Sequence, residues 1–290
     1  MLKLTVLIPV YKGGAWFKEC LESLVLHKKH IGSVVVSFNK SEMQREDIKI
    51  FEIFQKNNND IQCVKIVQTI SCSAAWHGRL IWWRLRHYMG ESHWMVLAHD
   101  DVLLPSFSDS LKKLESGING SVAVNPSRSY YDDAIKPENF IFSYFGLKAY
   151  ESGISVNDFI SLDFSCHYIT NISGVILPRK SLRHAWRLTS LLKHGYRAEY
   201  LYLTAYGVEK ILGTDAPVIG IRVHRGQEGS CNYKFSRCWD EKIYLVHLLF
   251  RTNDKLIKRK ILRQSRILRL IFSPREVALK AFKKICKKLK

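Results

Sequence analysis

The first 125 residues alternate between short apolar runs and longer amphipathic segments. The apolar runs are rich in β-branched residues and bounded by turn-forming residues, which favours strands at 4–10, 31–38, 61–68, 93–98 and 120–125. The segments between them have helical length, and we expect helices at 15–30, 41–57, 74–89 and 103–116. Alternating strands and helices predict an α/β fold, in which a mainly parallel sheet has helices on both faces.

The pattern changes after residue 125. Residues 126–170 form a long stretch rich in Tyr, Phe, Ser and Asp, which we interpret as irregular. A connection of this length is usually functional or disordered, and its aromatic content argues against disorder. We expect it to shape a substrate site. Further strands are predicted at 171–178 and 216–224, with a helix around 198–210 between them.

The last forty residues carry most of the positive charge. Residues 251–290 contain fifteen lysines and arginines against two acidic residues, so they hold thirteen of the nineteen excess positive charges. They predict two basic amphipathic helices separated at Ser273 and Pro274. In the first helix Ile257 and Ile261 lie on the apolar face. Such a segment indicates an anionic partner, either a membrane surface or nucleic acid.

Composition indicates a chain that can fold on its own. Hydrophobic residues make up 47% and aromatic residues 12% of 290 residues, which suits one large domain at 1–235 followed by a basic helical tail at 236–290. The seven cysteines form no C-x-x-C pair, and we expect reduced thiols in the cytoplasm. The apolar run at the N-terminus is too short to span a bilayer, so any membrane contact is expected to be peripheral.

Two adjacent carboxylates follow the predicted strand at 93–98. In "MVLAHDDVLLP", Asp100 and Asp101 stand where an apolar strand ends. Ligands of parallel α/β sheets bind beyond the carboxyl ends of the strands, which makes the pair a candidate site. Aspartate also caps helices, so the pair alone decides little.

Several stretches together resemble the family 2 glycosyltransferases of the GT-A fold. They are "VLIPVYKGGAWFKECLESL", "SVVVSFNKSE", "SCSAAWHGRLIWWRLRHYMGESHWMVLAHDDVLLP", "GYRAEYLYLTAYG" and "PVIGIRVHRGQEGS". Their order and separation match that family over residues 1–225. The resemblance implies a Rossmann-like sheet, with a nucleotide-sugar half at 1–125 and an acceptor half at 126–235. It also implies inverting transfer from a nucleotide-sugar, such as a UDP-sugar, to a saccharide or lipid-linked acceptor. Lipopolysaccharide, O-antigen or capsule synthesis is the expected context.

The resemblance also implies a divalent cation, Mn²⁺ or Mg²⁺, at the acidic pair. Carboxylate oxygens are ligands that these hard cations prefer. We assign Asp100 to the metal, His224 to the metal or the diphosphate, and Arg222 to the diphosphate. Asp101 is assigned to a donor-sugar hydroxyl or a neighbouring backbone group, with helix capping as an equal alternative. The sequence departs from the family's D-x-D signature, because Ala98 stands at the place of the first carboxylate.

The nucleotide is expected to bind at the ends of the first two strands. By resemblance, the loop containing Pro9, Val10 and Tyr11 holds the base. Asn39 stands near the place where the family often has an aspartate, and its amide can both donate to and accept from a base. Arg79 is expected to supply the cation that relatives carry before the fourth strand.

The proton of the acceptor hydroxyl needs a base, and the resemblance assigns this role to Glu199. The alternative is a solvated glutamate in a first helical turn. Asp163, Asp132 and Asp133 are weaker candidates, which fit turns as well.

The basic tail is compatible with two classes of protein. We favour a cytoplasmic enzyme that binds the inner face of the cell membrane through residues 251–290. The alternative is a nucleic-acid-binding protein, but the sequence has no zinc module or helix-turn-helix signature and residues 1–250 are only mildly basic, so no nucleic acid is expected. A nucleotidyltransferase fits poorly, because the first loop lacks a basic glycine-rich pattern. A catalytically degenerate relative stays open because of Ala98.

Overall fold

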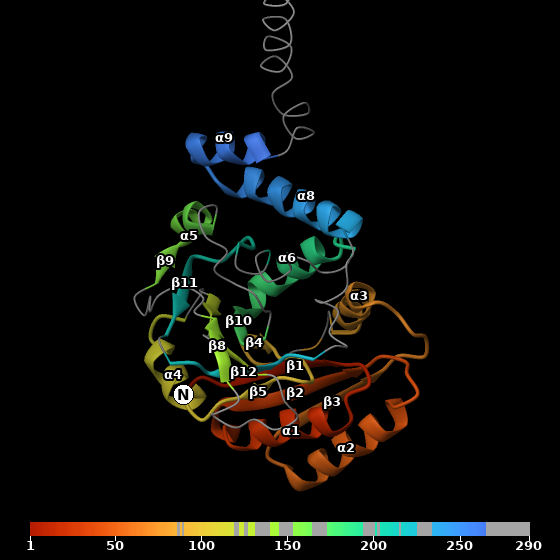
Figure 1. Cartoon of the computed structure of the whole chain (residues 1–290). Helices are drawn as coiled ribbons and strands as arrows, with labels where there is room; N and C mark the ends of the chain where they lie inside the picture. The colour runs from red at the N-terminus through yellow and green to blue at the C-terminus, as the bar shows by residue number, and fades with distance from the viewer. Residues whose placement is uncertain are drawn as a thin grey trace, which may run out of the picture.

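A computed structural model shows an α/β fold with two sheets (Figure 1). It describes residues 1–85, 88, 90–118, 122–124, 127–130, 140–144, 153–163, 173–193, 201, 204–214, 216–224 and 234–264. Glu199, Asp132, Asp133 and the second predicted tail helix lie outside the described residues.

Within the described residues the main sheet has eight strands, and six of them run in one direction. β10 and β9 run the other way. The prediction of a mainly parallel sheet is therefore confirmed. In spatial order the strands are β3 (Gln62–Val67), β2 (Ile31–Phe38), β1 (Leu4–Val10), β4 (His93–Val96), β10 (Val175–Pro178), β6 (Val122–Val124), β11 (Lys210–Gly213) and β9 (Ile154–Ser155).

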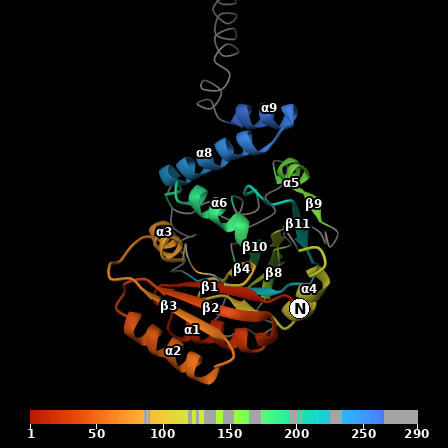
Figure 2. The same ribbon diagram turned by 180° about the vertical axis from the view of Figure 1, so that it is seen from behind.

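Helices cover the sheet on both faces, as predicted, and Figure 2 shows the same two layers from behind. Neighbouring residues of one strand enter different cores: Leu7 packs on one side, while Val6 and Ile8 pack on the other. One core includes α1 (Gly14–Val25), α2 (Gln44–Asn57) and α4 (Phe107–Leu114). The other includes α3 (Ala74–Leu85), α5 (Val156–Asp163), α6 (Arg179–Thr189), α8 (Lys234–Arg251) and α9 (Lys255–Gln264).

A smaller second sheet follows the acidic pair. Its order is β5 (Val102–Leu103), β12 (Ile219–Arg222), β7 (Ser127–Tyr130) and β8 (Phe140–Tyr144). β12 pairs with β5 and β7, so a strand from late in the chain lies beside the residues that follow Asp101.

Three local predictions need correction. The stretch at 126–170 is not wholly irregular, because it contributes β7, β8, β9 and α5. The predicted helix at 198–210 fails over its described end, where 204–209 are non-helical and Lys210 starts β11. The predicted helix at 103–116 begins only at Phe107, because Leu103 pairs with β12. In each case long-range strand pairing overrides the local pattern.

The start of the basic tail packs against the rest of the protein. α8 buries Tyr244 and Leu248, and α9 buries Ile257 and Ile261, all in the core that also contains α3 and α6. The apolar face expected to insert into a membrane is thus internal in this part of the chain. The division at 235/236 stays a prediction. Among the described helices, none combines the length and the apolar character that crossing a membrane requires.

Candidate functional site

The carboxyl ends of β1, β2 and β4 meet at one edge of the main sheet, because these strands are parallel neighbours. This edge brings together the loop after Val10, Asn39 and the acidic pair. β10 runs in the opposite direction, so its start lies at the same edge. Residues from four separated segments can therefore cooperate there.

Asp101 is turned into the protein and joins three segments. Its Oδ2 accepts a hydrogen bond from Ser173 Oγ at 2.5 Å, and its Oδ1 accepts one from the Arg222 backbone N–H at 3.1 Å. Ser173 Oγ in turn accepts from the Ala98 N–H at 2.9 Å. The side chain of Asp101 is only 1% exposed. Asp101 thus contacts a backbone group of Arg222, and its predicted roles stay predictions.

Asp100 points to a different partner. Its Oδ2 lies 3.0 Å from His224 Nε2, so the structure brings together the two side chains predicted to bind a metal. The ring of Trp16 packs on His224, with ring centroids 4.5 Å apart and planes inclined by 42°. The adjacent carboxylates therefore diverge, which relieves the repulsion that made the doublet unusual.

Arg222 is the buried cation of this cluster, with 1% of its surface exposed. Its Nε donates to the Asp100 carbonyl oxygen at 3.4 Å, and its guanidinium forms an ion pair with Glu19. The guanidinium carbon also lies 5.3 Å from the centre of the Trp16 ring. The predicted contact with a diphosphate is untested. In this structure the side chain binds protein groups.

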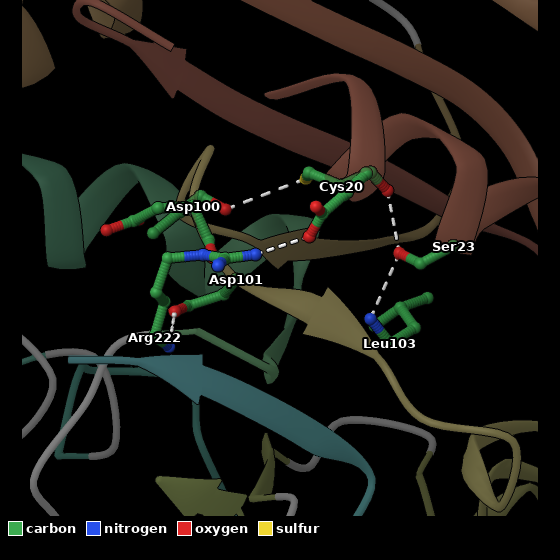
Figure 3. A network of polar contacts seen from close by, with 8 residues as sticks. Cys20, Ser23, Asp100, Asp101, Leu103 and Arg222 are labelled. Carbon is green, nitrogen blue, oxygen red and sulfur yellow. Dashed lines mark hydrogen bonds and ion pairs between the residues drawn. The ribbon is translucent and has the colours of Figure 1, made fainter. Parts of the chain in front are cut away.

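Helix α1 is fixed to the acidic turn by further polar contacts (Figure 3). Cys20 Sγ donates to the Ala98 carbonyl oxygen at 3.6 Å. Ser23 Oγ donates to the Cys20 carbonyl at 2.6 Å and accepts from the Leu103 N–H at 3.1 Å. Burial, followed by the nearby carboxylates, raises the pKa of Cys20 well above its ordinary value. The thiol therefore stays protonated and serves as a donor.

The loop after β1 is held by a carboxylate from α2. Asp47 accepts from the backbone N–H of Gly13 at 3.2 Å and of Gly14 at 2.7 Å. Gly14 has φ of 50°, a value that glycine adopts without strain, and the preceding Lys12 has φ of 55°. Tyr11 in this loop is 45% exposed, which leaves its ring accessible to a base. Its predicted contact stays a prediction.

Other predicted nucleotide contacts are placed in varied settings. The Asn39 amide bonds to the backbone of Cys72, donating to the carbonyl at 2.7 Å and accepting from the N–H at 3.2 Å. Base recognition by Asn39 would have to use the second N–H of its amide or displace these bonds. Val10 is buried in the core and Pro9 is half-buried, so Val10 can reach a ligand only through its backbone. Arg79 lies in α3, but its side chain is outside the described part, as is that of Asp163 in α5.

Two histidines at this edge, buried His77 and half-buried His99, are neutral at pH 7. His77 Nε2 lies 2.9 Å from Ser37 Oγ. Burial, with a smaller effect of His99, lowers the pKa of His77 to about 4. Burial also lowers the pKa of His99, although Asp100 and Asp47 act in the other direction. Neither imidazole adds positive charge to the site at neutral pH.

The described residues offer a partial metal site. Among them, no group of three or more His, Cys, Asp or Glu side chains is arranged to hold a metal ion. Asp100 and His224 nevertheless present an oxygen and a nitrogen to the same space, a donor set compatible with Mn²⁺ or Mg²⁺ when substrate oxygens and water complete the coordination.

Several residues of this cluster were not predicted from the sequence, among them Trp16, Glu19, Asp47 and Ser173. Asp47 had a detectable signal, because it shares the apolar face of its helix with Phe51 and Phe54, where a charge is unexpected. The others lie in ordinary local contexts, and only their long-range contacts distinguish them.

Comparison with solved structures assigns this sheet, with its carboxylate turn after β4, to the GT-A fold. TarS from S. aureus, residues 1–349 in complex with UDP-GlcNAc, matches with a TM-score of 0.65 at 15% identity, over 94% of this chain and 74% of that one. The mannosyltransferase PcManGT from Pyrobaculum calidifontis, in complex with GDP-Man and Mn²⁺, matches with a TM-score of 0.52 at 12% identity, over 89% and 68%.

GalNAc-T7 with UDP, GalNAc and Mn²⁺ matches with a TM-score of 0.54 at 11% identity, over 86% of this chain and 48% of that one. No protein-family profile and no curated protein sequence matches the chain. At these identities the similarity establishes the GT-A fold.

Proposed function

We propose that this chain is an inverting glycosyltransferase that uses a nucleotide-sugar donor. The observation that supports the proposal is the Asp100–His224 pair, which lies at the carboxyl edge of a GT-A sheet beside the loop after β1. Ligands of such sheets bind at this edge. The surrounding buried contacts hold the pair in place, as a site that binds charge requires.

The donor is proposed to be a UDP-sugar, in line with the TarS complex with UDP-GlcNAc. Tyr11 stacks on the base, and the backbone of the Gly13 loop lies near the diphosphate at the start of α1. Asp100 and His224 would hold Mn²⁺ or Mg²⁺, and the cation would supply charge stabilisation for the departing diphosphate.

Glu199 is proposed as the catalytic base. The acceptor hydroxyl oxygen forms the new bond to the anomeric carbon, the bond from that carbon to the diphosphate oxygen breaks, and Glu199 takes the hydroxyl proton. Attack from the face opposite the diphosphate inverts the configuration. Glu199→Gln keeps the size of the side chain, so it should slow transfer while donor affinity stays nearly unchanged. Loss of donor affinity alone would contradict the role as a base.

The donor experiment incubates the full chain with a panel of nucleotide-sugars, with and without Mn²⁺, and measures release of the nucleoside diphosphate. We expect metal-dependent turnover of a UDP-sugar. Asp100→Asn should reduce it about 100-fold or more, the scale expected for losing a charge-stabilising group. The matched control is Asp109→Asn, which removes an exposed carboxylate of α4. Release without metal, or an active Asp100→Asn variant, would remove the metal assignment, and UDP binding without any turnover would indicate the degenerate relative.

The acceptor is proposed to be a saccharide or lipid-linked glycan of lipopolysaccharide, O-antigen or capsule synthesis, reached at the cytoplasmic face of the membrane. Because the Ile257 face is buried, the membrane contact is assigned instead to the outer face of α9. Leu256, Arg259, Lys260 and Arg263 lie at helical spacing on that exposed face. Leu256 is 66% exposed and supplies an apolar contact.

Sedimentation with vesicles tests this contact. The full chain should bind vesicles containing an anionic lipid, bind neutral vesicles weakly, and dissociate at high salt. Reversing Arg259, Lys260 and Arg263 to Glu should weaken binding about 100-fold, since each cation near the surface contributes ~1 kcal/mol. The control reverses Arg45, Lys49 and Lys56 of α2, which lies on the opposite side of the molecule from α9 (Figures 1 and 2). Equal loss in both variants would contradict a specific role for α9.

A further inference from the structure

Helix α1 contributes two side chains, Trp16 and Glu19, that lie near the Asp100–His224 pair and have no role in the proposed function. Trp16 and Glu19 lie three positions apart, so they project from the same side of the helix. Trp16 packs on His224, and Glu19 pairs with Arg222. One helix therefore contacts both ends of the segment that brings His224 to the site.

The Arg222 end of this segment is fixed by contacts to the acidic turn and to α1. Its backbone N–H bonds to Asp101, its Nε bonds to the Asp100 carbonyl, its guanidinium pairs with Glu19, and the same guanidinium lies over the Trp16 ring. The Arg222 side chain is 1% exposed and its partner Glu19 is 37% exposed, so the arginine end of these contacts is shielded from water, which strengthens charged hydrogen bonds. The backbone entering His224 is thereby held.

The imidazole itself needs a separate restraint. His224 lies two residues beyond β12, so no strand pairing orients it. Rotation about its side-chain bonds would turn Nε2 away from Asp100 unless packing selects one rotamer. The Trp16 ring supplies that packing, with ring centroids 4.5 Å apart, and in this arrangement Nε2 lies 3.0 Å from Asp100 Oδ2.

We propose that Trp16 is a positioning residue, which packs on the His224 ring and keeps Nε2 directed to the space that it shares with Asp100. This inference rests on the proposed function, because it assigns the prearranged pair to the cation and diphosphate of the donor. A preformed pair of ligands avoids the cost of ordering them when the donor binds. Trp16 acts through His224 and does not itself touch the donor.

The first readout needs no donor. A ring packed on an indole experiences a ring-current shift, so the His224 ring protons in the NMR spectrum of the free chain should be displaced from their ordinary positions. Trp16→Leu should abolish the displacement, and Trp16→Phe should retain part of it. The control is Trp83→Leu, which removes an exposed tryptophan of α3. Unchanged His224 signals in Trp16→Leu would overturn the proposal.

The second readout is a double-mutant cycle on binding. Calorimetry measures the affinity for UDP in the presence of Mn²⁺ for the wild type, Trp16→Leu, His224→Ala and the double variant. Trp16→Leu should weaken binding about 10-fold or more, the scale found when the support of a metal ligand is removed. Trp16→Phe should recover most of the affinity. In the His224→Ala background, Trp16→Leu should cause no further loss, because the residue that it positions is already absent.

The outcomes separate this inference from the proposed function. If the wild type binds no UDP with Mn²⁺ and releases none from any donor, the proposed function fails, and the positioning role falls with it. If the wild type binds but the two substitutions are additive, the positioning role alone is overturned. Thermal unfolding of each variant shows whether a loss of affinity comes from loss of the fold. Trp16→Phe keeps an aromatic ring, so recovery of affinity in this variant distinguishes loss of ring packing from a folding defect.

Discussion

The carboxylate of Asp47 provides a sharp test of how the nucleotide loop is held. It is 1% exposed and accepts the backbone N–H groups of Gly13 and Gly14, at 3.2 Å and 2.7 Å. A hydrogen bond to a charged acceptor contributes ~1.5–3 kcal/mol, and a buried donor left without a partner carries its full desolvation cost. Asp47→Ala removes both bonds at once. We therefore expect the free energy of unfolding to fall by about 3–5 kcal/mol.

Asp47→Asn separates charge from shape. The amide keeps one acceptor oxygen for one of the two backbone donors but turns an N–H₂ group toward the other, so we expect an intermediate loss of about 1–3 kcal/mol. Urea denaturation, followed by circular dichroism, measures the change. Glu46→Ala, at the neighbouring exposed position of α2, should stay within ~0.5 kcal/mol of the wild type.

The reasoning would be refuted if Asp47→Ala lowered the free energy of unfolding by less than ~1 kcal/mol, as measured from its urea midpoint, with the slope of unfolding free energy against urea unchanged. It would mean that water or a rearranged loop satisfies the two donors. The affinity of the same variants for UDP tells whether an ordered loop at Gly13 is needed for donor binding. In the proposed function the loop lies next to the nucleotide and Asp47 does not, so Asp47 would act on binding only through the loop.

Three further changes have defined outcomes. Burial lowers the pKa of His77 to about 4 in the folded state, below its value in the unfolded chain. Between about pH 6.5 and 4 the unfolded state therefore binds more protons, and the free energy of unfolding should fall as the pH falls through that window. His77→Gln should flatten this part of the plot of unfolding free energy against pH. Ser173→Ala removes a donor to buried Asp101 and should cost about 1–3 kcal/mol in urea denaturation, whereas a neutral result would show that Asp101 finds another donor. Ile261→Ala should cost about 2–5 kcal/mol because the side chain is fully buried, while Leu256→Ala on the outer face should stay within ~0.5 kcal/mol; equal effects would mean that α9 is not docked as described.

The sequence predicted structure best for segments whose own residues are almost continuously apolar, because such a segment is buried whichever elements pack on it. The strands at 4–10 and 31–38 match β1 and β2 to the residue, because continuous β-branched runs suit a strand covered on both faces. It was least informative after residue 125. There β10, β11 and β12 are four residues each, and their pairing is decided by partners far along the chain.

The acidic doublet shows the same division within one pair of residues. The sequence alone determined that two carboxylates stand at a strand end, and that Arg222 and His224 stand toward the end of a later strand. Only the tertiary structure decided that Asp101 turns inward to Ser173 while Asp100 meets His224, since side-chain direction depends on donors contributed by distant segments.

The tail gives the final contrast. Helical periodicity predicted which residues of α9 share a face, because a 3.6-residue repeat is a local property. Whether that apolar face contacts lipid or protein is not local. The answer depends on the exposed apolar surface that α3, α6 and α8 leave to be covered, and in the fold Ile257 and Ile261 cover it.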